Sequence, residues 1–157
     1  YTHTTLFRSP KQYYQQGMGL FAIPIVFFQP GNEQLRGYNT RLMQQIDIMP
    51  SVLDLLHYDH PFFSFGNSAF DTTVKPFVFT ALDNQYFMLQ EPWLIRANVD
   101  KVQGYFRFPD DSLMQRNLRV NPDSSFAGNE KRFHAFLQWL NNSVLDNRQS
   151  LRTLSPR

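Results

Sequence analysis

The fold is decided by residues 21–58, which read FAIPIVFFQPGNEQLRGYNTRLMQQIDIMPSVLDLLHY. Residues 21–29 form an almost unbroken apolar run, which is typical of a strand covered on both faces, as in a parallel sheet between helices. Pro30 and Gly31 end the run, because proline donates no ladder hydrogen bond and glycine readily adopts positive φ. The sequence therefore predicts a buried strand followed by a loop.

The second half of this stretch predicts a helix. Residues 44–48 form a short segment that leads into the helix, and Pro50 lies where the first turn of a helix tolerates proline. Four aliphatic side chains then share one face, namely Val52, Leu53, Leu55 and Leu56. Asp47 precedes the helix, so we expect its carboxylate to accept hydrogen bonds from the free N–H groups of the first turn. Capping is favoured over catalysis for this residue.

A strand buried on both faces needs neighbouring strands, and the chain offers no second run like residues 21–29. With only one layer to pack on, about half of its large apolar side chains would face water. That exposure forfeits on the order of 5–10 kcal/mol, which is comparable to the stability of a whole domain. The chain is therefore expected to be the C-terminal part of a larger α/β protein whose other strands precede it.

Composition excludes several classes of function. The 157 residues are 42% hydrophobic, which is enough for the core of one ordinary domain. A net charge of +2, with scattered lysines and arginines, argues against nucleic acid as a partner. The chain has no cysteine, so its residues supply no disulfide, thiolate metal site or cysteine nucleophile. The longest apolar run, residues 20–28, is far short of the roughly 20 residues of a transmembrane helix, so no transmembrane segment is expected.

His57, Asp59 and His60 form the one cluster that looks like metal ligands, because imidazole and carboxylate groups lie on one loop. The alternative is a polar exit from the helix before Pro61, with His57 in the last turn. This alternative is favoured, because neighbouring positions rarely converge on one ion without a third ligand. His134 is expected at the surface of a later helix.

Residues 61–70, PFFSFGNSAF, are expected to form an ordered loop held by its phenylalanines. Four short runs rich in β-forming residues then predict an antiparallel meander, over residues 77–82, 85–90, 93–98 and 102–108. Residues 129–148 place apolar side chains at spacings of three and four, which predicts an amphipathic helix capped by Asn129. A glycosylation pattern at residues 141–143 falls within this helix and is discounted.

Residues 1–9, YTHTTLFRS, lack a clear period and resemble the conceptual translation of a sequencing-adapter sequence. They are expected to be non-native and are left out of fold reasoning. An ordinary loop is the alternative.

Three segments resemble the sulfatase-like branch of the alkaline phosphatase superfamily, particularly envelope proteins similar to lipoteichoic acid synthases, the phosphoglycerol transferases. Residues 19–31, GLFAIPIVFFQPG, resemble the family's strand after its Asp-His metal motif. Residues 44–56, QQIDIMPSVLDLL, resemble its Ile-Asp-x-x-Pro-Thr/Ser helix start, and residues 61–70 resemble its loop ending in a small residue and Phe. Order and spacing agree over roughly the first half of the chain. His57 departs from the pattern, because a glycine commonly follows the Leu-Leu of this helix, so its C-cap is expected to differ.

The resemblance implies a parent enzyme that acts on sulfate or phosphate esters, as a hydrolase or as a phosphoglycerol transferase. Its threonine, serine or formylglycine nucleophile would be activated by a divalent metal, Mn, Mg, Ca or Zn. The family's nucleophile and metal ligands precede the strand at residue 21. No residue of this chain is therefore assigned as catalytic, cofactor-binding or metal-binding, and the chain alone is expected to be inactive.

The resemblance also implies the fold class and the setting. The expected fold is α/β, the C-terminal part of an alkaline-phosphatase-like sandwich in residues 10–70, followed by an antiparallel subdomain with a final helix in residues 71–157. The parent is expected to be membrane-anchored with an extracytoplasmic catalytic domain. Its partners would be the upstream part of the same protein and an envelope lipid, glycan or ester substrate.

An alternative from another class rests on aromatic density alone. The meander could present aromatic side chains to a glycan or a lipid headgroup, namely Tyr86, Trp93, Tyr105 and Phe106. Aromatic residues more often fill cores, so the enzyme-fragment interpretation is favoured.

Overall fold

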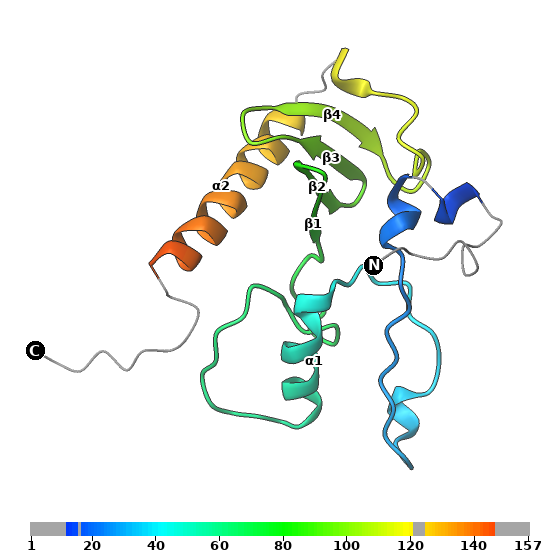
Figure 1. Cartoon of the computed structure of the whole chain (residues 1–157). Helices are drawn as coiled ribbons and strands as arrows, with labels where there is room; N and C mark the ends of the chain where they lie inside the picture. The colour runs from blue at the N-terminus through cyan, green and yellow to red at the C-terminus, as the bar shows by residue number, and fades with distance from the viewer. Residues whose placement is uncertain (1–11, 16, 121–124, 147–157) are drawn as a thin grey trace, which may run out of the picture.

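The computed structural model describes residues 12–15, 17–120 and 125–146, and it shows a mixed α/β architecture (Figure 1). The expected segment at residues 1–9 lies outside these ranges. The α-helices are α1 (Ile48–Leu55) and α2 (Ser125–Leu145). The strands are β1 (Val78–Leu82), β2 (Gln85–Gln90), β3 (Trp93–Ala97) and β4 (Val102–Arg107). Short 3-10 helices are η2 (Gln12–Tyr14), η3 (Gly17–Phe21), η4 (Glu33–Leu35), η5 (Gln45–Asp47) and η6 (Leu118–Val120).

The four strands form one antiparallel sheet in the order β1-β2-β3-β4, so the predicted meander is confirmed. The β1–β2 turn has φ 50° at Asp83 and φ 57° at Asn84. Positive φ at both central residues matches the right-handed twist of a hairpin, and Asp and Asn tolerate this conformation best among residues with a Cβ. The Asp-Asn pair therefore sets the register in which Leu82 faces Gln85.

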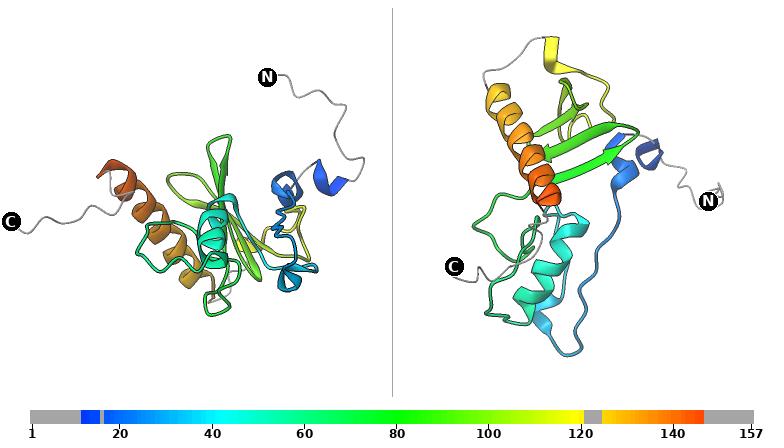
Figure 2. Two further views of the ribbon diagram at one scale, coloured as in Figure 1. Left: turned by 90° about the horizontal axis from the view of Figure 1, so that it is seen from below. Right: turned by 60° about the vertical axis from the view of Figure 1, so that its left-hand side comes forward.

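The sheet is covered on both faces (Figure 2). On one face α2 packs Phe126, Phe133 and Leu137 against a cluster that includes Met88 and Tyr105. On the opposite face, the N-terminal turns and the segment after β4 cover a second cluster. Its buried members are Met18, Phe87, Leu89, Leu94 and Phe106. Successive side chains of the strands point to opposite faces of the sheet, and each face contributes to a buried cluster.

The predicted final helix is confirmed, but Asn129 is not its cap, because α2 already begins at Ser125. The reason lies in packing. Phe126 stacks on the ring of Tyr105, with 4.3 Å between centroids and 5° between planes, and meets the edge of Trp93 at 4.9 Å. These two ring contacts favour a helical first turn around Phe126, which the spacing of apolar residues in the sequence does not predict.

The prediction of a strand at residues 21–29 is wrong for the described structure. Phe21 ends η3, and residues 22–29 form neither helix nor strand. They run away from the sheet and the chain returns after η4 (Figure 1). A strand needs a neighbour for its N–H and C=O groups, and none of the described residues pairs with this segment. Several of its apolar side chains are left in water, with Val26 81% and Phe28 83% exposed.

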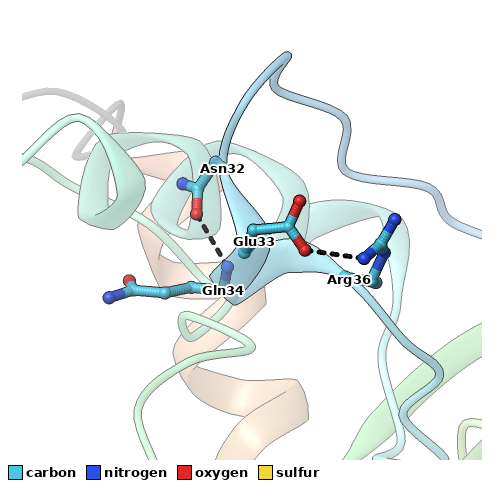
Figure 3. Close-up of polar contacts among 4 residues, drawn as sticks. All are labelled: Asn32, Glu33, Gln34 and Arg36. Atoms are coloured by element: carbon cyan, nitrogen blue, oxygen red, sulfur yellow. Dashed lines mark hydrogen bonds and ion pairs between the residues drawn. The ribbon is translucent and has the colours of Figure 1, made fainter.

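The far end of this excursion is ordered by local polar contacts (Figure 3). The Asn32 side-chain oxygen accepts a hydrogen bond from the backbone N–H of Gln34 at 3.0 Å, which caps η4. Arg36 pairs with Glu33 at 2.8 Å. Both partners are highly exposed, so this ion pair adds little to stability. The turn is fixed by its cap rather than by the charges.

At each edge of the sheet, the side-chain amide of a residue outside the sheet binds two backbone groups of the edge. At the β1 edge, Gln44 Oε1 accepts from Phe79 N at 2.9 Å and its Nε2 donates to Phe77 O at 3.2 Å. At the β4 edge, Asn117 Oδ1 accepts from Tyr105 N at 3.2 Å and its Nδ2 donates to Gln103 O at 3.0 Å. Each carboxamide thus makes the two bonds that one residue of an additional strand would make.

Gln44→Glu tests the β1 edge. One carboxylate oxygen still accepts from Phe79 N–H, but the other faces the carbonyl of Phe77, so we expect a loss of about 1–3 kcal/mol in unfolding free energy at neutral pH. Below the pKa of the buried acid, its O–H can donate to that carbonyl. The loss should therefore shrink as pH falls, measured by urea unfolding. Gln138→Glu on the exposed face of α2 is the control, and equal losses in both variants would contradict the edge role.

Candidate functional site

The start of α1 and the loop of residues 61–70 are held together by the carboxylate of Asp47. This residue is buried, its Oδ2 accepts from Gln44 N at 2.9 Å and its Oδ1 accepts from Asn67 N at 2.9 Å. Asp47 stands at the N-cap position of α1 but makes no side-chain bond to the first turn. The predicted bonds to the first turn of α1 are therefore wrong, but the carboxylate takes part in a capping box at η5, the turn that leads into α1, by accepting from Gln44 N. The carboxylate instead joins the helix start to a loop twenty residues away.

Ser51 makes the second connection between α1 and this loop. Its hydroxyl donates to Asp47 O at 2.6 Å and accepts from Ala69 N at 2.8 Å, and the residue is fully buried. Gly66 lies directly against the helix start, because a Cβ there would fall 2.3 Å from Ile46 O and 2.6 Å from Asp47 Oδ1. The residues of the Ile-Asp-x-x-Pro-Ser and Gly-Asn-Ser segments thus form one interlocked unit.

Burial raises the pKa of Asp47 above its ordinary value, opposed by hydrogen bonds from the amides of Asn67 and Gln44 and by the charge of Arg41. The folded state therefore binds a proton at Asp47 more readily than the unfolded chain. The ionised carboxylate costs stability at neutral pH, and this cost is relieved as pH falls through the raised pKa. Because Asp47 is buried and both its oxygens are engaged, its role is to position the loop.

Arg41 extends the same unit toward the sheet. Its Nη2 donates to Asp71 O and to Val74 O, both at 2.7 Å. The guanidinium therefore binds the connection between the loop and β1. This connection ends next to Phe77 and Phe79, whose backbone groups Gln44 binds. Three side chains, those of Arg41, Gln44 and Asp47, fix the course of residues 64–79.

An open hollow of about 650 Å³ lies between α1 and the loop that Asp47 and Ser51 hold. Aromatic rings of Tyr58, Phe62 and Phe70 contribute to its lining. Its polar lining residues are Asp54, Ser64, Asn67, Ser68, Asp71 and Thr72. Asp54 Oδ2 accepts from the Ser68 hydroxyl. Among the described residues, neither lysine, arginine nor histidine contributes to the lining.

Asp71 is ionised at this hollow. Hydrogen bonds from the hydroxyl and the backbone N–H of Thr73, at 2.6 and 2.8 Å, hold the pKa of the Asp71 carboxyl below its ordinary value. The hollow therefore carries negative charge and hydrogen-bonding groups beside exposed aromatic rings. Sequence reasoning missed it, because its residues come from the helix, its exit and the loop, with no periodic signal.

The cluster of His57, Asp59 and His60 lies at the exit of α1. All three side chains are exposed, and His60 Nε2 lies 3.5 Å from Asp59 Oδ1. Among the described residues, no group of three His, Asp or Glu side chains is placed to hold a metal ion. The three residues form an exposed polar segment at the end of the helix, which is the favoured one of the two interpretations.

His57 also ends the helix. It adopts φ 52°, and its N–H donates to Asp54 O at 3.0 Å while Tyr58 N donates to Leu53 O at 2.9 Å. These two bonds are those of a Schellman motif, in which glycine is the usual left-handed residue. His57 therefore adopts, at a steric cost, a backbone conformation that glycine adopts readily.

The four aromatic residues considered for glycan or headgroup binding are split between the two faces of the sheet. Tyr105 is buried under α2, and Tyr86 and Trp93 pack against the same cluster. Phe106 is buried on the opposite face. They serve as core residues and form no common exposed surface. His134 is exposed on α2 as predicted, and Ser143 of the discounted glycosylation pattern is buried in the helix.

We expect Gly66→Ala to lower the unfolding free energy by about 1–3 kcal/mol, because its methyl group would displace Ile46 O and Asp47 Oδ1. The matched control is Gly128→Ala, since Gly128 lies in α2 with open space around its Cβ position. That change should raise stability by up to about 1 kcal/mol. Urea unfolding of both variants measures the effect, and a Gly66→Ala protein as stable as the parent would disprove the close packing.

His57→Gly should raise the unfolding free energy by about 0.5–1 kcal/mol, because glycine adopts the left-handed conformation without steric cost. His60→Gly, at a neighbouring exposed residue that does not have positive φ, should bring no gain. Thermal and urea unfolding compare the two. A gain of equal size at both positions would point to a charge effect instead of the Schellman geometry.

Comparisons of the chain with protein-family models, with curated proteins and with solved structures gave no match.

Proposed function

We propose that the chain is the C-terminal part of a metal-dependent sulfatase-like hydrolase or transferase, similar to the phosphoglycerol transferases, and that it is not catalytic by itself. The parent would act on sulfate or phosphate esters. The observation that carries the proposal is apolar surface left uncovered on the two elements that resemble the family, residues 21–29 and α1.

The helix α1 exposes much of its apolar surface. Ile48, Met49 and Val52 are each more than one-third exposed, and Leu56 is 69% exposed. In the extended segment before the helix, Ile23 is 59%, Val26 81% and Phe28 83% exposed. A helix and an extended segment that both leave apolar residues in water are typical of surfaces that pack against further protein. In the proposal, that protein is the upstream part of the same chain.

The polar unit below this surface supports the same proposal. Asp47, Ser51 and Gly66 belong to the segments that resemble the family, and each has a defined structural task in holding the loop to α1. The finer fold, an alkaline-phosphatase-like sandwich, would follow if upstream parallel strands supplied the hydrogen-bonding neighbour that residues 21–29 lack. Those residues contain only one proline, Pro24, and no glycine.

The chemistry of the parent would reside upstream. A divalent cation, Mn, Mg, Ca or Zn, would activate the nucleophile and neutralise charge on the transferring group during in-line displacement. This segment would shape the rim of the substrate site. Anchoring in the envelope membrane would also come from upstream. Among the described residues, no helix is long and apolar enough to cross a bilayer.

The gene upstream of Pro10 provides the first test, read from independent DNA. We expect codons for an Asp-His pair shortly before Gly19, for a threonine, serine or formylglycine-type site farther upstream, and for hydrophobic spans before that. An upstream sequence without an Asp-His pair would refute the proposal.

The enzymatic part has its own measurement. The complete upstream-plus-C-terminal protein should cleave nitrophenyl phosphate or nitrophenyl sulfate only with a divalent cation, and chelation should abolish the reaction. The 157-residue chain alone should be inactive under the same conditions. Turnover by the chain alone would contradict the assignment of catalysis to the upstream part.

A further inference from the structure

We infer that the hollow between α1 and the loop of residues 62–72 is a binding site for a neutral carbohydrate. The inference uses only the residues of that hollow and stands whether or not the chain has the proposed parent. Its starting point is the combination of exposed aromatic rings with fixed hydrogen-bonding groups on one concave surface.

Three aromatic side chains contribute to the lining and remain substantially exposed, with Tyr58 47%, Phe62 42% and Phe70 40% accessible. Tyr58 and Phe62 lie near each other, with 6.4 Å between ring centroids. A sugar ring has apolar C–H faces that stack on aromatic rings and a rim of hydroxyl groups. Exposed rings beside hydrogen-bonding groups suit such a ligand, because burying apolar surface is favourable while the rim keeps its polar partners.

The polar lining supplies those partners. Asp54 and Asp71 present carboxylate oxygens, Ser68 and Thr72 present hydroxyl groups, and Asn67 presents a carboxamide. The groups are held in place, since Ser68 donates to Asp54, Thr73 donates to Asp71, and the loop is fixed by Asp47 and Ser51. Hydroxyl groups of a sugar can donate to the carboxylates and accept from the amide, which matches this mixed set.

Charge selects among ligand classes. The described lining has two carboxylates and no basic side chain, which disfavours a phosphate, a sulfate or any other anion. A cation would gain little from these carboxylates, because the hollow is open to water and ion pairs exposed to water contribute little. Its volume of about 650 Å³ lies within the roughly 300–1,000 Å³ of ligand sites. A neutral carbohydrate is therefore the ligand that the surface fits best.

The test is a titration of the 157-residue chain, followed by backbone amide resonances in two-dimensional NMR and by calorimetry. The probes are cellopentaose, maltopentaose and chitopentaose, with choline chloride and inorganic phosphate as charged comparisons. We expect saturable shifts of the amides of Gly66, Asn67, Ser68 and Thr72 with at least one oligosaccharide. Absence of shifts with all three at millimolar concentration, or shifts caused only by choline or phosphate, would overturn the inference.

Three variants test whether the oligosaccharide binds at this hollow or to exposed aromatic residues in general. Tyr58→Ala should weaken the oligosaccharide affinity by about tenfold, whereas Tyr38→Ala, at a tyrosine that is 92% exposed outside the hollow, should leave it unchanged. Asp54→Asn should also weaken binding while the thermal unfolding curve shows that the fold is retained. Equal weakening by Tyr58→Ala and Tyr38→Ala would overturn the assignment. The upstream gene sequence decides the proposed function separately from these results.

Discussion

The structure depends on one buried carboxylate that accepts backbone hydrogen bonds from both sides of a long connection. Asp47 joins the approach to α1 with a loop twenty residues later, through Gln44 N and Asn67 N. Its oxygens bind both amides in place of the water that the fold excludes. Two other side chains also bind backbone groups of the loop, because Ser51 accepts from Ala69 N and Arg41 donates to the carbonyls of Asp71 and Val74. The first half of the chain is therefore shaped by polar side chains acting on backbone groups, whereas the second half is shaped by apolar packing on a sheet.

This difference explains which parts of the fold the sequence could predict. Strands β1 to β4 follow from alternation and turn residues, which are local signals, and α2 follows from its apolar spacing. The strand predicted at residues 21–29 also followed from a local signal, but strand formation needs a partner elsewhere, and the described residues supply none. The mistaken start of α2 has a similar origin, because the contacts of Phe126 with Tyr105 and Trp93 come from distant positions.

The candidate site was still less predictable. The His57, Asp59 and His60 cluster was the visible signal, yet its side chains lie exposed at the end of α1. The groups that build the hollow and its support are amides, hydroxyls and aromatic rings whose spacing follows no period. Asp47 could be recognised as structural, since an acidic residue before a helix has a physical reason to be there. Its partners Gln44 and Asn67 could not, because the course of the intervening loop decides which amides reach it.

The two carboxamides at the sheet edges have a consequence for any larger assembly. Another strand can pair with the backbone groups that Gln44 and Asn117 occupy only after it displaces these side chains. In the proposed parent, a parallel sheet of residues 21–29 with upstream strands that left both carboxamides in place would be a separate sheet, not a continuation of this one. The assembled protein would consist of two independently hydrogen-bonded layers, and residues 36–44 would be the covalent path along which a displacement of one layer reaches the other.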